Sequence, residues 1–160
     1  MIEIFTSGFF VGRPHGVGGG GAIVTSEAGE IGRVKRVFGP SDLSSSIAAE
    51  LAVLADALEK ARSAGGGGEP VIVRTGFASL VDLCKGRHPK GISDVGALLE
   101  RLGEIAQDFA EVRAIVSPGW VTARPHDLAV RAVLDQVRQG SNIIKKPEQG
   151  VESSSSSLEC

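Results

Sequence analysis

The chain has 160 residues, of which 42% are hydrophobic and 22% charged, and this length and composition suit one compact domain with its own core. A formal net charge of −2 excludes an overall basic field of the kind that attracts nucleic acid. Two distant cysteines, Cys84 and Cys160, argue against a disulfide framework, and no apolar run is long enough to span a membrane. We therefore expect a protein of the cytoplasm or an organelle matrix that is not secreted and has no membrane partner.

The first quarter of the chain predicts three strands. Residues 1–11 cluster and alternate Ile, Phe and Val as a strand does. Residues 22–24 predict a short second strand, and residues 31–38 a third, with a hairpin turn at residues 27–30. The glycine run at residues 18–21 is not followed by the Lys and helix of a phosphate-binding loop, so we interpret it as a flexible hairpin or bulge.

The remainder alternates between helices and strands. Ile47, Leu51, Leu54 and Leu58 fall at helical spacing behind a run of serines that can cap the helix. The later elements predicted, in chain order, are a strand at 70–74, one or two helical turns at 77–83, an amphipathic helix at 95–109, a strand at 112–116 and a helix at 125–137.

This order predicts an α/β fold with one five-stranded mixed sheet, in which three antiparallel strands precede βα units and helices cover both faces. We assign residues 1–138 to this domain. Residues 139–160 are polar and include five consecutive serines, so we expect a disordered tail there.

Five short strings stand in the same order as these elements. They are Ile-Glu-Ile-Phe-Thr-Ser-Gly at 2–8, Val-Gly-Arg-Pro at 11–14 leading through glycines to Gly-Ala-Ile-Val at 21–24, Ala-Ala-Glu-Leu at 48–51, Val-Ile-Val-Arg-Thr-Gly at 71–76 and Asp-Leu-Ala-Val-Arg at 127–131. Together these strings resemble the bacterial type I ribonucleases H. The resemblance covers roughly residues 2–138, and it implies a ribonuclease H-like fold.

The resemblance also implies a metal site. In that family four carboxylates hold two divalent ions, which activate a water and stabilise the departing oxygen of a phosphodiester. The resemblance places two of the four at Glu50 and Asp127, but Ser7 and Gly76 stand at the other two positions. Losing one positioned electrostatic group typically costs about 10²–10³ in rate, so we expect no ordinary two-metal catalysis and no cofactor. Glu50 is then either vestigial or structural, through a hydrogen bond to Ser7, and we favour the structural role over metal binding.

Three further features carry alternatives. The basic turn with Lys85, Arg87 and Lys90 either contacts a phosphate backbone or, more commonly for such turns, is simply solvated. We interpret His126 as a solvent-exposed residue near a helix start. Trp120 either stacks on a base or packs at the sheet edge, and packing is the favoured interpretation.

The leading hypothesis is a catalytically degenerate ribonuclease H-like domain that serves as a structural or interaction module. Its expected partner is a protein or ribonucleoprotein assembly, with RNA or an RNA–DNA hybrid as a further candidate. The alternative is a divergent ribonuclease H that cleaves the RNA strand of RNA–DNA hybrids with Mg²⁺ or Mn²⁺ held by Glu50 and Asp127. A third hypothesis is a hybrid or duplex binder without cleavage, acting through the Lys85–Lys90 turn.

Overall fold

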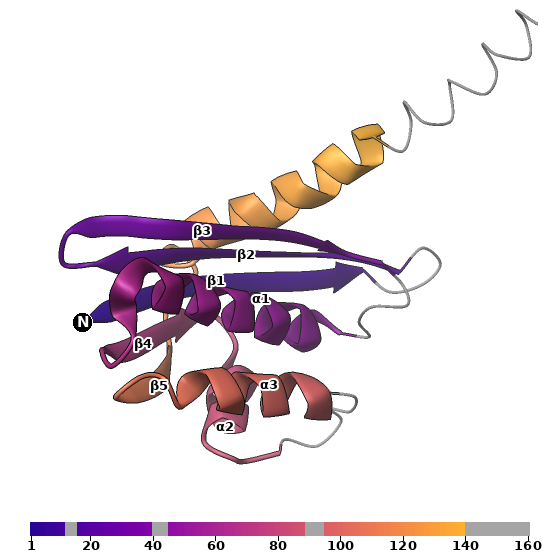
Figure 1. Cartoon of the computed structure of the whole chain (residues 1–160). Helices are drawn as coiled ribbons and strands as arrows, with labels where there is room; N and C mark the ends of the chain where they lie inside the picture. Colours follow the sequence, from indigo (N-terminus) through magenta and orange to yellow (C-terminus); the bar gives the residue numbers. More distant parts are fainter. Residues whose placement is uncertain (12–15, 40–44, 89–94, 140–160) are drawn as a thin grey trace, which may run out of the picture.

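The computed structural model describes residues 1–11, 16–39, 45–88 and 95–139 as one mixed sheet with helices on both faces (Figure 1). The sheet order is β3-β2-β1-β4-β5. β1 pairs antiparallel with β2 and β2 with β3, whereas β1 and β4, and β4 and β5, run parallel. The strands are β1 (Ile2–Val11), β2 (Val17–Ser26), β3 (Gly29–Phe38), β4 (Pro70–Thr75) and β5 (Glu111–Val116).

The described helices follow the order that the sequence predicts. They are α1 (Ser46–Ala61), a short π-helical turn η1 (Arg62–Gly66), α2 (Ala78–Cys84), α3 (Gly96–Ala106) and a last helix over residues 123–139, which we call the C-terminal helix. The predicted α/β class, the five-stranded mixed sheet and the helices on both faces are thus confirmed.

Helix α1 lies at the centre of the hydrophobic core. Ser45 caps it as the serine run predicts, because its hydroxyl accepts a hydrogen bond from the Ala48 N–H at 3.2 Å. Its leucines Leu51, Leu54 and Leu58 are fully buried against the sheet. Replacing a leucine in such a position by alanine costs about 2–5 kcal/mol, so this helix contributes much of the stability.

The glycine run is part of a strand, so the interpretation of a flexible hairpin or bulge is wrong. Residues 18–21 lie inside β2 and pair in unbroken register with β1 on one side and β3 on the other. A Cβ on Gly20 would lie 2.1 Å from Val53 Cγ2 of α1, whereas a Cβ on Gly21 would lie 2.1 Å from the Pro125 carbonyl oxygen. Glycine is needed here because two helices contact the β2 backbone from opposite faces.

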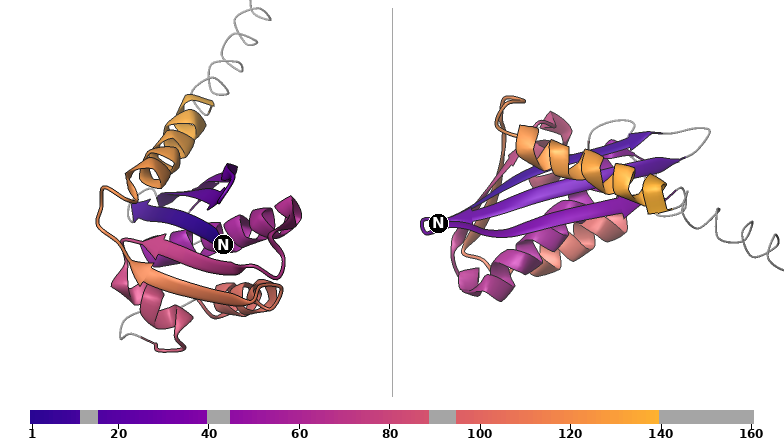
Figure 2. Two further views of the ribbon diagram at one scale, coloured as in Figure 1. Left: turned by 90° about the vertical axis from the view of Figure 1, so that its left-hand side faces the viewer. Right: turned by 90° about the horizontal axis from the view of Figure 1, so that it is seen from above.

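This close approach fixes where the C-terminal helix begins. Figure 2 shows that helix lying across the antiparallel strands on the face opposite α1. Because side chains alternate along a strand, Gly19 and Gly21 face the C-terminal helix and Gly20 faces α1. The start of the C-terminal helix therefore lies on the sheet beside the carboxyl-terminal half of β1.

Candidate functional site

Glu50 is enclosed beneath the sheet by two strands. Its side chain is fully buried on α1, and its Oε1 accepts hydrogen bonds from Thr6 Oγ1 at 2.6 Å and Thr75 Oγ1 at 2.5 Å. The Gly8 N–H also bonds to this carboxyl group. A Cβ on Gly8 would lie 2.5 Å from the Glu50 backbone nitrogen, so α1 contacts β1 directly at this point. Glu50 thus ties α1 to the parallel pair β1 and β4.

Burial determines the electrostatics around Glu50. Removal from water raises the pKa of this carboxyl above its ordinary value, although the bonds from Thr6, Thr75 and Gly8 act in the opposite direction. Burial, together with the charge of Glu50, raises the pKa of the Cys84 thiol to about 11. Cys84 is a free cysteine in the described part of the chain. These are the properties of a structural carboxyl in the core.

Ser7 lies on the opposite face of β1 from Thr6, because neighbouring strand residues point to opposite faces. Its hydroxyl is 3.1 Å from His126 Nδ1, and the His126 ring packs against Phe9 with ring centroids 6.1 Å apart. The proposed hydrogen bond between Ser7 and Glu50 is therefore wrong, since Thr6 and Thr75 take that place. His126 is exposed at a helix start, as predicted, and it also contacts the position that the family fills with aspartate.

Asp127 is exposed and lines a different surface from His126. It borders a hollow of about 210 Å³ between β3 and the C-terminal helix, together with Ile23, Leu128 and three arginines. The arginines are Arg33, Arg124 and Arg131. Glu50 faces threonines in the core and Asp127 faces arginines at the surface, so the two retained carboxylates have separate surroundings.

Gly76 follows the last residue of β4 and adds no ligand. A Cβ at this position would have only ordinary contact, 3.9 Å from Thr122 Oγ1, so the backbone surroundings do not exclude a β-carbon there. Within residues 1–11, 16–39, 45–88 and 95–139, no three His, Cys, Asp or Glu side chains are grouped to hold a metal ion. Magnesium requires several anionic oxygens on rigid elements. The donor set around Ser7, Gly76 and Glu50 does not fit the metal pair that the resemblance implies.

The basic turn after α2 is well exposed. Lys85 ends α2, and Arg87 lies 3.8 Å from Asp82 with 72% of its side chain accessible. Lys90 lies outside the described residues. An ion pair as exposed as Arg87–Asp82 contributes little to stability. Whether this turn is simply solvated or contacts a phosphate backbone stays a prediction.

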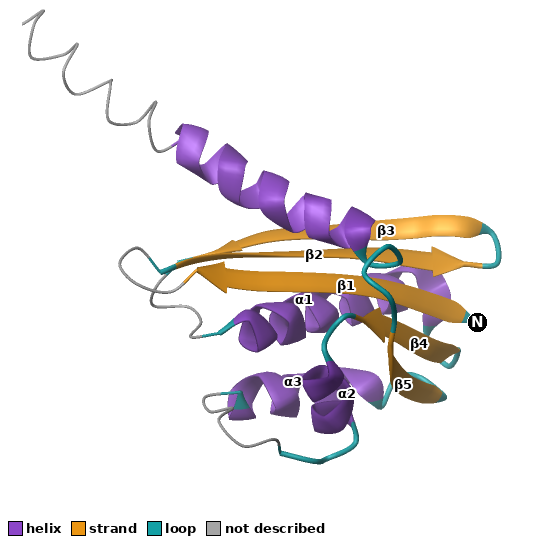
Figure 3. Cartoon of the chain, turned by 180° about the vertical axis from the view of Figure 1, so that it is seen from behind, coloured by secondary structure: helices purple, strands orange, loops and turns teal. Residues whose placement is uncertain are grey.

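Trp120 does not pack at the sheet edge, so the favoured interpretation of this residue is wrong. It is 81% exposed, and it lies in the segment that Figure 3 shows running from β5 to the C-terminal helix. A turn holds it there: the Val121 N–H donates to the Pro118 carbonyl oxygen at 2.9 Å. The sequence alone could not predict that Trp120 is exposed, because its exposure depends on the path of the segment between β5 and the C-terminal helix.

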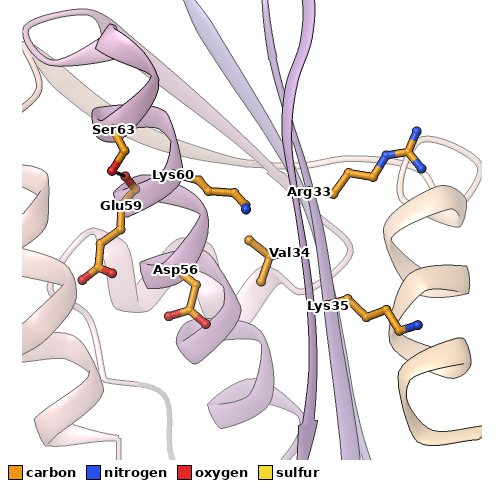
Figure 4. Close-up of a pocket in the computed structure, with 7 residues that line it drawn as sticks. All are labelled: Arg33, Val34, Lys35, Asp56, Glu59, Lys60 and Ser63. Atoms are coloured by element: carbon orange, nitrogen blue, oxygen red, sulfur yellow. Dashed lines mark hydrogen bonds between the residues drawn. The ribbon is translucent and has the colours of Figure 1, made fainter. Parts of the chain in front are cut away.

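Another hollow, of about 410 Å³, lies between α1 and the edge strand β3 (Figure 4). Figure 4 shows Val34 pointing toward α1, while Arg33 and Lys35 point away toward the C-terminal helix. Asp56 in this hollow is already engaged, by Arg36 at 2.9 Å and by Arg101 at 2.9 Å. The hollow is thus bordered by ion pairs that connect β3, α1 and α3.

No family model matches the sequence, and neither does any curated protein. In the described part of the chain, none of the helices is long and apolar enough to cross a membrane.

The structure is similar to solved ribonuclease H domains. The N-terminal RNase H domain of Rv2228c from Mycobacterium tuberculosis, solved as a fusion with maltose-binding protein, is 20% identical, with a TM-score of 0.70 over 81% of this chain and 96% of that chain. RNase H1 from the archaeon Halobacterium salinarum is 19% identical, with a TM-score of 0.70 over 84% and 98%. LC11-RNase H1, solved in complex with an RNA/DNA hybrid, is 20% identical, with a TM-score of 0.73 over 86% and 99%. The chain therefore has the ribonuclease H-like fold.

Proposed function

We propose that the chain is a catalytically degenerate ribonuclease H-like domain that serves as a structural or interaction module in a nucleic-acid-containing assembly. The observation that carries this proposal is the enclosure of Glu50, whose carboxyl group is bonded to Thr6, Thr75 and Gly8 in the core. A carboxylate that binds a divalent cation must present a free, ionised oxygen to the ion, whereas burial opposes ionisation of Glu50 and two threonines already bond to its Oε1.

The surroundings of the other family positions support the same proposal. Ser7 is a neutral hydroxyl beside His126, and Gly76 has no side chain. Asp127 borders the same hollow as three arginines, whose positive charges oppose the binding of a cation there. A site with this donor set lacks the anionic charge that two divalent ions require.

Cleavage of a labelled RNA–DNA hybrid tests the proposal against its alternative, a divergent metal-dependent ribonuclease H. The full chain is assayed with Mg²⁺ and with Mn²⁺, beside LC11-RNase H1 as the positive control. We expect no metal-dependent cutting by this chain under conditions in which the control digests the RNA strand.

Two variants identify the source of any cutting that is seen. Asp127→Asn changes an exposed side chain, so its fold is retained, and Glu50→Gln keeps the size of the buried group. Metal-dependent cleavage by the wild type that disappears in both variants would overturn the proposal. Cleavage that persists in both comes from a contaminating nuclease and leaves the proposal intact.

A restored variant tests whether the missing carboxylates are the cause. Ser7→Asp with Gly76→Asp supplies both absent groups, and a β-carbon at position 76 would make only ordinary contact. We expect Mg²⁺ to raise the thermal unfolding temperature of this variant and to leave that of the wild type unchanged, because only the variant presents new anionic oxygens. A wild type that Mg²⁺ stabilises as much as the variant contradicts the proposal.

A further inference from the structure

The turn before the C-terminal helix presents an aromatic side chain to solvent on a fixed backbone. Trp120 is 81% exposed and is the only tryptophan of the chain. The Val121 N–H bonds to the Pro118 carbonyl, Thr122 Oγ1 donates to the Gly119 carbonyl at 3.4 Å, and the His126 N–H donates to the Thr122 carbonyl at 3.1 Å. These bonds join the turn to the helix and fix the indole outside the core.

One arginine of a positive group lies in the first turn of the helix that this turn precedes, and the other two lie on β3 and further along the helix. Arg33, Arg124 and Arg131 line one hollow, and Arg124 is only four residues beyond Trp120. Arg33 donates two hydrogen bonds to Glu30, and Arg124 Nη2 donates to Glu30 Oε2 at 3.2 Å. Glu30 holds these two guanidinium groups side by side, and its hydrogen bond with Arg33 lowers the pKa of its carboxyl.

The charge of this surface is positive even with its acidic members. The three arginines carry three positive charges, and Glu30 and Asp127 carry two negative ones, so the surface has a net charge of +1. The adjacent Lys35–Asp135 pair is neutral. The side chains of Arg33 and Arg124 remain 55% and 68% exposed. Their unused N–H groups are therefore available to an anion from solvent.

An exposed indole on the turn that leads into an arginine-bearing helix fits a nucleic acid strand better than a protein surface. A protein interface has a broad apolar centre, yet Trp120 is the one large hydrophobic residue exposed among residues 117–133; Val116 ends β5, and Leu134 and Val137 lie in the second half of the C-terminal helix. Stacking on an aromatic side chain requires an open base face, which a duplex does not offer along its length.

We propose that Trp120, Arg33, Arg124 and Arg131 form a binding surface for single-stranded nucleic acid, in which one base stacks on Trp120 and neighbouring phosphates contact the arginines. This inference names a partner class for the interaction module and so rests on the proposed function. It places binding at the start of the C-terminal helix and away from the turn with Lys85 and Arg87.

The fluorescence of the sole tryptophan reports directly on this contact. The full chain is titrated with an oligouridylate, an oligothymidylate and a blunt-ended RNA–DNA hybrid. We expect saturable quenching by the single strands, weaker binding of the hybrid, and affinity that falls as salt rises. Absence of saturable quenching by either single strand, or tighter binding of the hybrid, overturns the inference and favours a protein partner for Trp120.

Matched variants show which side chains contribute to binding. The affinity of each variant for a labelled single strand is measured by fluorescence anisotropy. Trp120→Ala should weaken binding roughly tenfold, whereas Trp120→Phe keeps a ring to stack on and should retain most of the affinity. Arg124→Ala with Arg131→Ala should weaken binding and flatten its salt dependence. Lys85→Ala with Arg87→Ala is the charge-matched control pair at the rival basic turn and should weaken binding less than the Arg124 and Arg131 pair does. Binding that only this control pair weakens overturns the inference.

The two proposals fail differently. A chain that binds single strands and cuts nothing supports both. A chain that neither binds nor cuts overturns the binding surface alone, because the degenerate site is judged by cleavage. Metal-dependent cutting of the hybrid overturns the proposed function whatever the titration shows.

Discussion

At the scale of single residues, a carboxylate that the resemblance assigns to metal binding is bonded inside the core. Glu50 stands where the resemblance expects a metal ligand, yet Thr6 and Thr75 both donate to the same carboxyl oxygen. Thr75 Oγ1 also accepts the Phe77 N–H at 3.0 Å, which orients its hydroxyl proton toward Glu50. The residue that the sequence points to for chemistry is thus a buried connection between a helix and two strands.

Glu50 should make stability depend on pH in a definite direction. Its folded pKa is raised, so between the ordinary carboxyl pKa and the folded value the folded state keeps a proton that the unfolded state has lost. Stability from this group is therefore complete below the ordinary pKa and is lost as pH rises through the folded pKa. Glu50→Gln has the shape of the protonated carboxyl and does not titrate. As pH rises, the unfolding free energy of this variant should therefore increase relative to that of the wild type.

Urea unfolding of both proteins from about pH 4 to about pH 7 measures this effect. The other acidic groups are common to both chains, so they cancel in the difference between the two free energies. A difference that stays constant over this range, or that moves in favour of the wild type, would show that burial does not raise the pKa of Glu50.

At the scale of elements, β2 decides how tightly the layers pack. Successive glycines of β2 face opposite sides of the sheet, and on each side a helix packs directly against the strand. Propensity assigns glycine runs to loops, because glycine loses the most conformational freedom in a strand. The close approach of two helices, which no local pattern encodes, offsets that cost.

A pair of glycine substitutions separates packing from propensity. Gly20→Ala places a methyl group 2.1 Å from Val53 Cγ2, and overpacking of this kind costs about 1–3 kcal/mol. Gly103→Ala lies on an exposed position of α3 with nothing within 4 Å, so it should stabilise by up to about 1 kcal/mol. Thermal and urea unfolding of the two variants check both signs. Equal effects at the two positions would refute the packing explanation for β2.

At the scale of the whole molecule, the order and type of the described elements followed from the sequence. The leucine spacing behind Ser45 predicts α1, and β-branched runs predict β4 and β5. The missed features all depend on docking between distant segments. His126 meets Ser7 across 119 positions, and neither the exposure of Trp120 nor the arginine surroundings of Asp127 exists until the C-terminal helix lies on the sheet.

The boundary of the folded domain at residue 138 stays a prediction. Every core residue that the structure describes lies between Ile2 and Ala132, so residues 139–160 are not expected to contribute to this core. A chain that ends at Arg138 should therefore unfold within about 0.5 kcal/mol of the full chain in urea, because changes away from a core rarely exceed that size. It should also keep the slope of that transition, since the slope scales with the surface that unfolding exposes. A loss of more than about 1 kcal/mol, or a shallower transition, would place part of the folded unit beyond residue 138.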